Sequence, residues 1–183
     1  MKLPFKTQAS LIVCAMLVLP LAQAATISKA DYQAGKTRIS DTYKTERSAC
    51  ATFAANARDI CIEESSAKQK VARAELEYSY TAKPKDLSKV GVAKADAVYA
   101  VAKERCDDKA GNDKSVCVKE AKAIHVKALA DVKMGRQIGE AKTDAATDKR
   151  NADYQVAAQK CDALQGDAKN NCMSAAKARF GKV

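Results

Sequence analysis

The sequence has very few large apolar side chains. It contains no tryptophan and only three phenylalanines in 183 residues, and much of its 47% hydrophobic content is alanine, which occurs 37 times. From Ala25 onward, Leu, Ile, Val, Phe and Met together account for 25 of 159 residues, below the level expected of a conventional globular core. This shortage argues against a β-sandwich, a barrel or a doubly wound sheet.

Proline and strand-like patterns are equally scarce. Pro84 is the only proline after residue 24, and the alternation of apolar and polar residues that is typical of strands is missing. Alanine, lysine, glutamate and arginine are abundant, and all four are strong helix formers. The composition therefore predicts an all-α protein. Because low hydrophobicity with a net charge of +10 otherwise favours disorder, we expect cysteines to stabilise it.

The first 24 residues resemble a secretory signal peptide. Lys2 and Lys6 precede an apolar run of nine residues from Leu11 to Leu19, and the motif Ala22-Gln23-Ala24 is typical of a cleavage site. We expect cleavage between Ala24 and Ala25. The run is shorter than the roughly 20 residues that a membrane span needs, and no later run reaches that length. The mature chain is therefore predicted to be periplasmic, in an oxidising compartment.

Six cysteines follow residue 24, and their spacing reveals an internal repeat. Ten residues separate the members of each pair: Cys50 and Cys61, Cys106 and Cys117, Cys161 and Cys172. The first member recurs after 56 and then 55 residues, and a tyrosine lies seven residues before it each time: Tyr43, Tyr99 and Tyr154. Three copies of one unit are the economical interpretation. We predict three antiparallel helical hairpins, each closed by a disulfide, with the tyrosines as packing residues.

The loops inside the pairs favour a reversal of the chain. Gly111 and Gly166 break helix in the second and third copies, whereas Asn56 takes the place of the glycine in the first. Tyr99 and Cys106 lie on one helical stripe with steps of three and four residues, as in coiled coils. Each disulfide is expected to contribute on the order of 3 kcal/mol, because it closes a loop of about a dozen residues.

These features predict the domain organisation. Residues 1–24 form the signal peptide, 25–83 the first hairpin, 84–134 the second, and 154–183 the third. Ser28-x-x-Asp31 predicts the start of the first helix, and the second copy is expected to start near Ser88. The charged segment 135–153, with its two glycines, is predicted to be a helical linker or hinge. We favour an elongated arrangement, and both a monomer and a homo-oligomer are compatible with the sequence.

The sequence offers no catalytic constellation. His125 is the only histidine, so one chain cannot form a histidine-based triad or a histidine-rich metal site, and we expect this residue at the surface or flank of a helix. Zinc sites use cysteines two to four residues apart, unlike these pairs. The sequence predicts no catalytic residue, no metal and no cofactor, and hence a non-enzymatic protein.

The charge favours anionic or protein partners in the envelope. The mature chain has 30 basic and 22 acidic residues, a net charge of +8 that is spread along the helices. We expect binding to envelope proteins or anionic cell-wall material through helix faces. Nucleic acid is not an expected partner, because the export signal directs the chain elsewhere and no aromatic stacking platform is present.

Two other functions remain open at this stage. One is a periplasmic small-ligand or metal-binding protein that uses acidic residues at the hairpin tips, for example Asp107, Asp108 and Asp113; the first copy has only Asp59 in that loop. The other is a periplasmic chaperone or stress factor, which would need an exposed apolar cradle.

The segments VAKERCDDKAGNDKSVCVKEAKA and AAQKCDALQGDAKNNCMSAAKARFGK resemble a group of uncharacterised exported proteobacterial proteins. These are rich in alanine and lysine and carry the same paired cysteines, and some are labelled as TolA-like cell-envelope proteins. The resemblance covers nearly the whole mature chain. It implies a helical protein of the cell envelope and assigns no role to an individual residue.

We expect the native protein from an envelope fraction, measured without reductant, to have the mass of residues 25–183 less six hydrogens. Intact mass spectrometry reads out cleavage and three disulfides together. Free thiols, a metal adduct or a lipid adduct on the same sample would contradict this expectation.

Overall fold

The computed structural model describes residues 26–182, so the predicted signal peptide and its cleavage site at Ala24 and Ala25 lie outside the described part of the chain. Within that part all regular structure is helical, and the prediction of an all-α fold is confirmed. The elements are α1 (Lys29–Ala49), η1 (Cys50–Thr52), α2 (Ala55–Thr81), α3 (Pro84–Arg105), η2 (Cys106–Asp108), α4 (Gly111–Asp162) and α5 (Gly166–Phe180).

Three disulfides close three antiparallel hairpins, as predicted. They join Cys50 to Cys61, Cys106 to Cys117 and Cys161 to Cys172, with Cα–Cα distances of 5.6, 5.7 and 5.6 Å. These distances lie within the range of about 4.4–6.8 Å that a disulfide requires. The helices can approach this closely because small side chains lie between them.

The three hairpin tips share one backbone turn. The carbonyl of the first cysteine accepts a hydrogen bond from the amide three residues later, at Phe53, Lys109 and Leu164. The outgoing helix then begins with a left-handed residue, which is Gly111 (φ 56°) or Gly166 (φ 55°) in two copies. In the first copy this residue is Ala55 (φ 48°), so the sequence alignment that put Asn56 in the glycine position was wrong by one residue.

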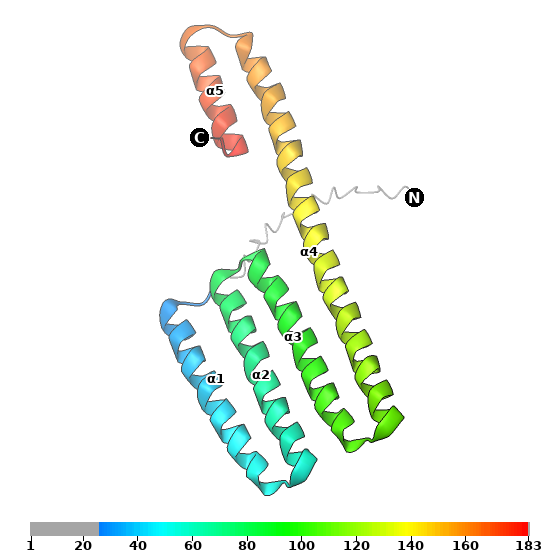
Figure 1. Cartoon of the computed structure of the whole chain (residues 1–183). Helices are drawn as coiled ribbons and strands as arrows, with labels where there is room; N and C mark the ends of the chain where they lie inside the picture. Colours follow the sequence, from blue (N-terminus) through cyan, green and yellow to red (C-terminus); the bar gives the residue numbers. More distant parts are fainter. Residues whose placement is uncertain (1–25, 183) are drawn as a thin grey trace, which may run out of the picture.

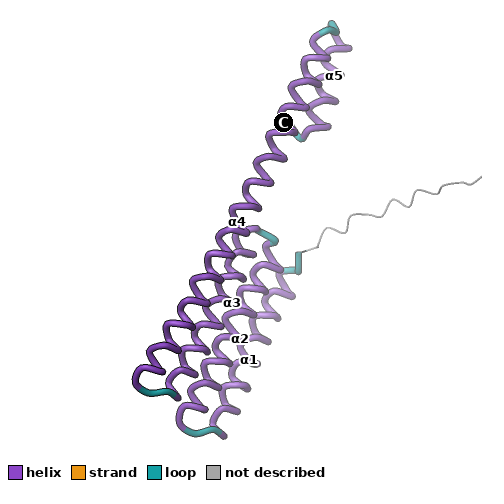
Figure 2. Tube along the Cα trace, turned by 90° about the vertical axis from the view of Figure 1, so that its right-hand side faces the viewer, coloured by secondary structure: helices purple, strands orange, loops and turns teal. Residues whose placement is uncertain are grey.

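The helices form an open row. In Figure 1, α1, α2, α3 and the first half of α4 lie side by side, and α4 then continues beyond the end of α3 to carry α5. Figure 2, turned by 90°, also shows the third hairpin extended away from the others. The elongated arrangement is therefore confirmed, with the first two hairpins packed together.

The first hairpin begins with a capped helix and ends in a tight turn that joins it to the second hairpin. Ser28 caps α1 by accepting a hydrogen bond from the Asp31 amide at 3.0 Å, as the sequence predicted. At the end of α2, which lies beside the start of α1, Ala82 is left-handed (φ 50°) and Pro84 is the first residue of α3. The second copy thus starts four residues before Ser88, because proline is favoured in the first turn of a helix.

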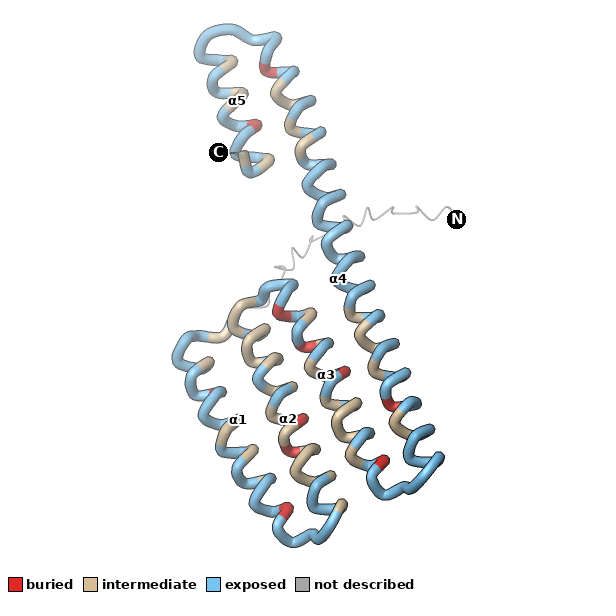
Figure 3. Tube along the Cα trace, in the orientation of Figure 1, coloured by how far each residue is buried: buried red, intermediate tan, exposed pale blue. Residues whose placement is uncertain are grey.

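The interior is thin and built from small residues. Figure 3 shows only scattered buried positions along the helices. Most of the buried residues are alanine or cysteine: Cys50, Ala67, Val90, Ala95, Cys106, Ala121, Cys161 and Ala176. Two glycines at equivalent repeat positions accommodate large neighbours: a Cβ on Gly35 would lie 2.7 Å from Leu76, and one on Gly91 would lie 2.6 Å from Val132. Close helix contact takes the place of a bulky core.

The 52-residue helix α4 runs without a break through the predicted linker 135–153. Gly135 and Gly139 are helical there, and every residue from 133 to 150 is exposed. The helical part of that prediction agrees with the structure, and the glycines do not interrupt the helix.

We expect the substitution Ala55→Gly to raise the free energy of unfolding by about 1 kcal/mol, because glycine adopts the left-handed region without the steric cost that alanine has. The reverse substitution Gly111→Ala should lower it by a similar amount. Denaturant unfolding of the oxidised protein measures both. Ala57→Gly is the control, since this exposed helical position should lose stability instead.

Candidate functional site

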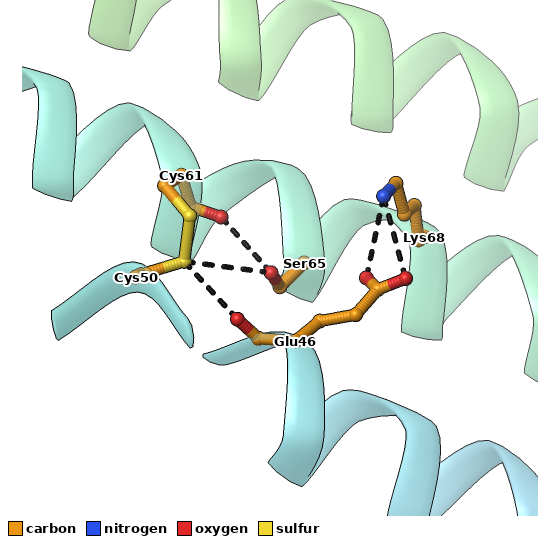
Figure 4. Close-up of polar contacts among 5 residues, drawn as sticks. All are labelled: Glu46, Cys50, Cys61, Ser65 and Lys68. Carbon is orange, nitrogen blue, oxygen red and sulfur yellow. Dashed lines mark hydrogen bonds and ion pairs between the residues drawn. A yellow bond between two sulfur atoms is a disulfide. The ribbon is translucent and has the colours of Figure 1, made fainter. Parts of the chain in front are cut away.

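Each disulfide is partly shielded by its own hairpin. Cys50 and Cys106 are fully buried, and Cys161 nearly so. In the first hairpin, the Sγ atom of Cys50 lies 3.3 Å from the Glu46 carbonyl and 3.9 Å from the Ser65 hydroxyl (Figure 4). The Ser65 hydroxyl also donates to the Cys61 carbonyl at 3.0 Å. These contacts place the first sulfur between the two helices, as suits a structural disulfide.

The three repeat tyrosines line the seams of their hairpins. Tyr99 stacks on His125 with ring centroids 4.8 Å apart, and Tyr154 meets Phe180 edge to face at 6.2 Å. Tyr43 borders a small groove together with Gln69. Gln69, His125 and Phe180 occupy the same repeat position, so each tyrosine faces an equivalent residue on the returning helix.

His125 is more enclosed than the sequence suggested. Its side chain is 18% exposed, and its Nε2 atom lies 2.6 Å from a carboxylate oxygen of Asp96. The residue therefore closes the second hairpin against both Tyr99 and Asp96. Sequence reasoning missed this role, although the alignment of His125 with Phe180 in the repeat could have revealed it.

The acidic residues at the second tip are engaged in structural contacts. Asp107 pairs with Lys114 at 2.8 Å, and Asp108 accepts a hydrogen bond from the Asn56 amide at 2.7 Å. Asn56 also donates to the Glu104 carbonyl at 3.3 Å, so it links the tips of the first two hairpins. Asp113 lies apart from these contacts, in the first turn of α4. Within residues 26–182 no group of three or more His, Cys, Asp or Glu side chains is placed to hold a metal ion.

Asp86 fixes the turn between the first two hairpins. It is 5% exposed and accepts hydrogen bonds from the Lys89 ammonium and the Thr81 hydroxyl, both at 2.7 Å. The bond from Lys89, followed by that from Thr81, lowers the pKa of Asp86 below its usual value of 3.8. A buried carboxylate that accepts two hydrogen bonds stabilises this turn, because its removal would leave both donors without their partner.

Open grooves follow the seams of the row, and two of them are similar in size. The first, about 560 Å³, lies between α1 and α2 and is lined by Tyr32, Lys36, Arg73 and Glu77 among others. The Tyr32 hydroxyl donates to Glu77 at 2.5 Å, which raises the pKa of the tyrosine. The second, about 550 Å³, lies between α2 and α3, and its walls are mostly Ala and Val. Both are open surface features.

Comparison with known proteins gives no relative of this chain: no family model, curated protein or solved structure matches it. Across residues 26–182, none of the helices combines the length and apolar character required to cross a membrane. What the described chain presents is a set of long, charged helix faces with shallow grooves between them.

We expect Asp86→Asn to lower the melting temperature at pH 7, because it removes the charge that Lys89 and Thr81 stabilise. The folded state holds the pKa of Asp86 below its unfolded value, so this contribution is present above about pH 4 and is lost as the pH falls through the folded pKa. Thermal melts from pH 7 to pH 2 should show the two proteins converging. Asp148→Asn, at an exposed site, is the control, and an equal effect there would contradict the role of Asp86.

Proposed function

We propose that this protein is a non-enzymatic structural or interaction protein of the cell envelope that works in the periplasm. The observation that carries the proposal is the open row of helices, in which α4 extends the third hairpin beyond the first two (Figure 1). Such a layer exposes helix faces over its whole length. A surface of this kind suits contact with an extended partner better than it suits enclosure of a small substrate.

The disulfides support the proposed periplasmic location. Three disulfides are typical of proteins in oxidising environments, and the signal-like N-terminus favours export. Covalent closure also compensates for the thin interior, since a chain with few large buried side chains gains little from apolar burial. The chemistry of the fold thus matches a protein that must persist in the envelope.

The charge supports anionic cell-wall material or acidic envelope proteins as partners. Ion pairs such as Lys68 with Glu46 and Lys94 with Glu75 occupy some basic groups. Other lysines point from exposed positions of α4, among them Lys119, Lys122 and Lys133. Exposed charges of this kind attract anionic polymers weakly, and the attraction falls with ionic strength.

Cosedimentation with purified cell wall across a salt series tests the wall-binding form of the proposal. We expect binding at low salt that declines as salt screens the charges. Replacing Lys119, Lys122 and Lys133 by glutamine should weaken binding severalfold, because three cationic groups are lost from one helix.

The matched control replaces two exposed alanines, Ala49 and Ala57, by glutamine and should bind like the parent. Circular dichroism checks that all variants keep their helices. Absence of sedimentation with the wall at the lowest salt would eliminate wall binding and leave envelope proteins as the partner class.

A further inference from the structure

The first two hairpins meet through a defined set of contacts between α2 and α3. Glu64 pairs with Arg105 at 2.6 Å, and Glu75 pairs with Lys94 at 2.7 Å. Val98 from α3 borders the apolar groove between these two ion pairs. The two helices are antiparallel, so these pairs define the register in which one hairpin docks on the previous one.

Residues equivalent to these pairs, one repeat further along the chain, lie on α4. The positions of Glu64 and Arg105 are taken by Glu120 and Lys160, and those of Glu75 and Lys94 by Asp131 and Lys149. Each substitution keeps the sign of the charge. The first half of α4 therefore retains the acidic members, and its second half the basic members, of the pairs that dock the first hairpin onto the second.

The remaining positions change in matched fashion. Val71 and Val98, which line the groove between α2 and α3, correspond to Lys127 and Asp153, so an apolar pair becomes an oppositely charged pair. Lys68 and Val101 line the same groove and correspond to Ile124 and Val156, an apolar pair. Asn56, which links the first two tips, corresponds to Asn112. Each pair of α4 positions therefore remains complementary, either in charge or in apolar character.

These residues do not meet within one chain, because all lie on the single helix α4. Ile124 and Val156 are each 57% exposed, and Glu120, Asp131, Lys149 and Lys160 are exposed as well. Their steps of three and four residues place them on one face of the helix. In Figure 1, α3 and α5 lie on the same side of α4, and no described element lies along its opposite side.

The connection between the second and third hairpins explains why α4 stays straight. The first two hairpins are joined by left-handed Ala82, then Lys83 and Pro84. The next repeat is one residue shorter, 55 instead of 56 between tyrosines, and it has no proline at this place. A shortened connection disfavours a sharp reversal and promotes exchange of an element between copies.

We propose that two copies of the chain form a two-fold dimer in which their α4 helices pack antiparallel. The third hairpin of each copy then docks on the first half of α4 of the other, as the second hairpin docks on the first. Each contact occurs twice, as two-fold symmetry requires. The contacts pair Glu120 with Lys160, Asp131 with Lys149, Lys127 with Asp153 and Ile124 with Val156, one residue from each copy.

The centre of this interface also fits a close approach. The two-fold axis falls at the level of residue 140, and the nearest positions on the stripe that carries the docking residues are Gly135, Ile138 and Lys142. A Cβ on Gly135 would meet nothing within 4 Å in the single chain. Glycine leaves room for a second backbone at this point.

Sedimentation velocity and equilibrium on the oxidised mature protein test the dimer. We expect a dimer for the parent chain, and the double variant Lys149→Glu and Lys160→Glu should weaken it at least tenfold by opposing like charges. Adding Asp131→Lys and Glu120→Lys should restore it, because the pairs are re-formed with reversed signs. Lys122→Glu with Lys133→Glu, the same charge change on another face of α4, is the control and should leave the dimer intact.

A second variant tests the connection. Changing Ile138→Ala and Gly139→Pro, with a lysine inserted between them, rebuilds the Ala-Lys-Pro turn of the first two hairpins. The third hairpin should then fold onto α4 of its own chain and give a compact monomer. A monomeric parent chain, or a charge reversal without effect on the dimer, would overturn the proposal. Wall binding is measured in a separate experiment, so failure of the dimer can be distinguished from failure of the proposed function.

Discussion

The close approach of two helices within each hairpin is the constraint on which the rest of the structure depends. A disulfide holds the Cα atoms 5.6 to 5.7 Å apart, and this spacing admits only small residues nearby. The equivalent buried positions are accordingly Ser65, Ala121 and Ala176. Because large side chains are excluded from the seam, the hairpin cannot build a thick core, and covalent closure offsets the burial that is missing.

The thin hairpin in turn determines how the molecule presents its surface. Hairpins with little apolar area pack through a narrow seam of alanines, valines and ion pairs, as α2 and α3 do. A row of this kind leaves much of each helix in contact with solvent (Figure 3). The extended charged faces that we connect with envelope partners are therefore a consequence of the way the hairpins are closed.

Differences between the repeats carry as much information as their likeness. Gln69, His125 and Phe180 occupy one position, and each faces the tyrosine of its own hairpin in a different chemical setting. Pro84 has no counterpart in the third copy, and there the turn gives way to a continuous helix. Small changes at the junction between repeats thus decide whether a hairpin packs on the preceding one, as the second does, or extends away from it, as the third does.

The sequence by itself determined the features that depend on neighbours close in the chain. Helical composition, the paired cysteines and the turn glycines predicted the hairpins, because residues 11 apart on a helix-turn-helix have few ways to meet. Ala55 in the glycine position was missed, although the equal spacing of the cysteines aligns it with Gly111; only its left-handed conformation needed the structure. The tertiary structure alone decided that Asp86 is buried beside Thr81, that Asn56 reaches across 52 residues to Asp108, and that the third hairpin stands apart. These contacts join residues on different helices, and their geometry depends on how the helices pack, which local sequence preferences do not specify.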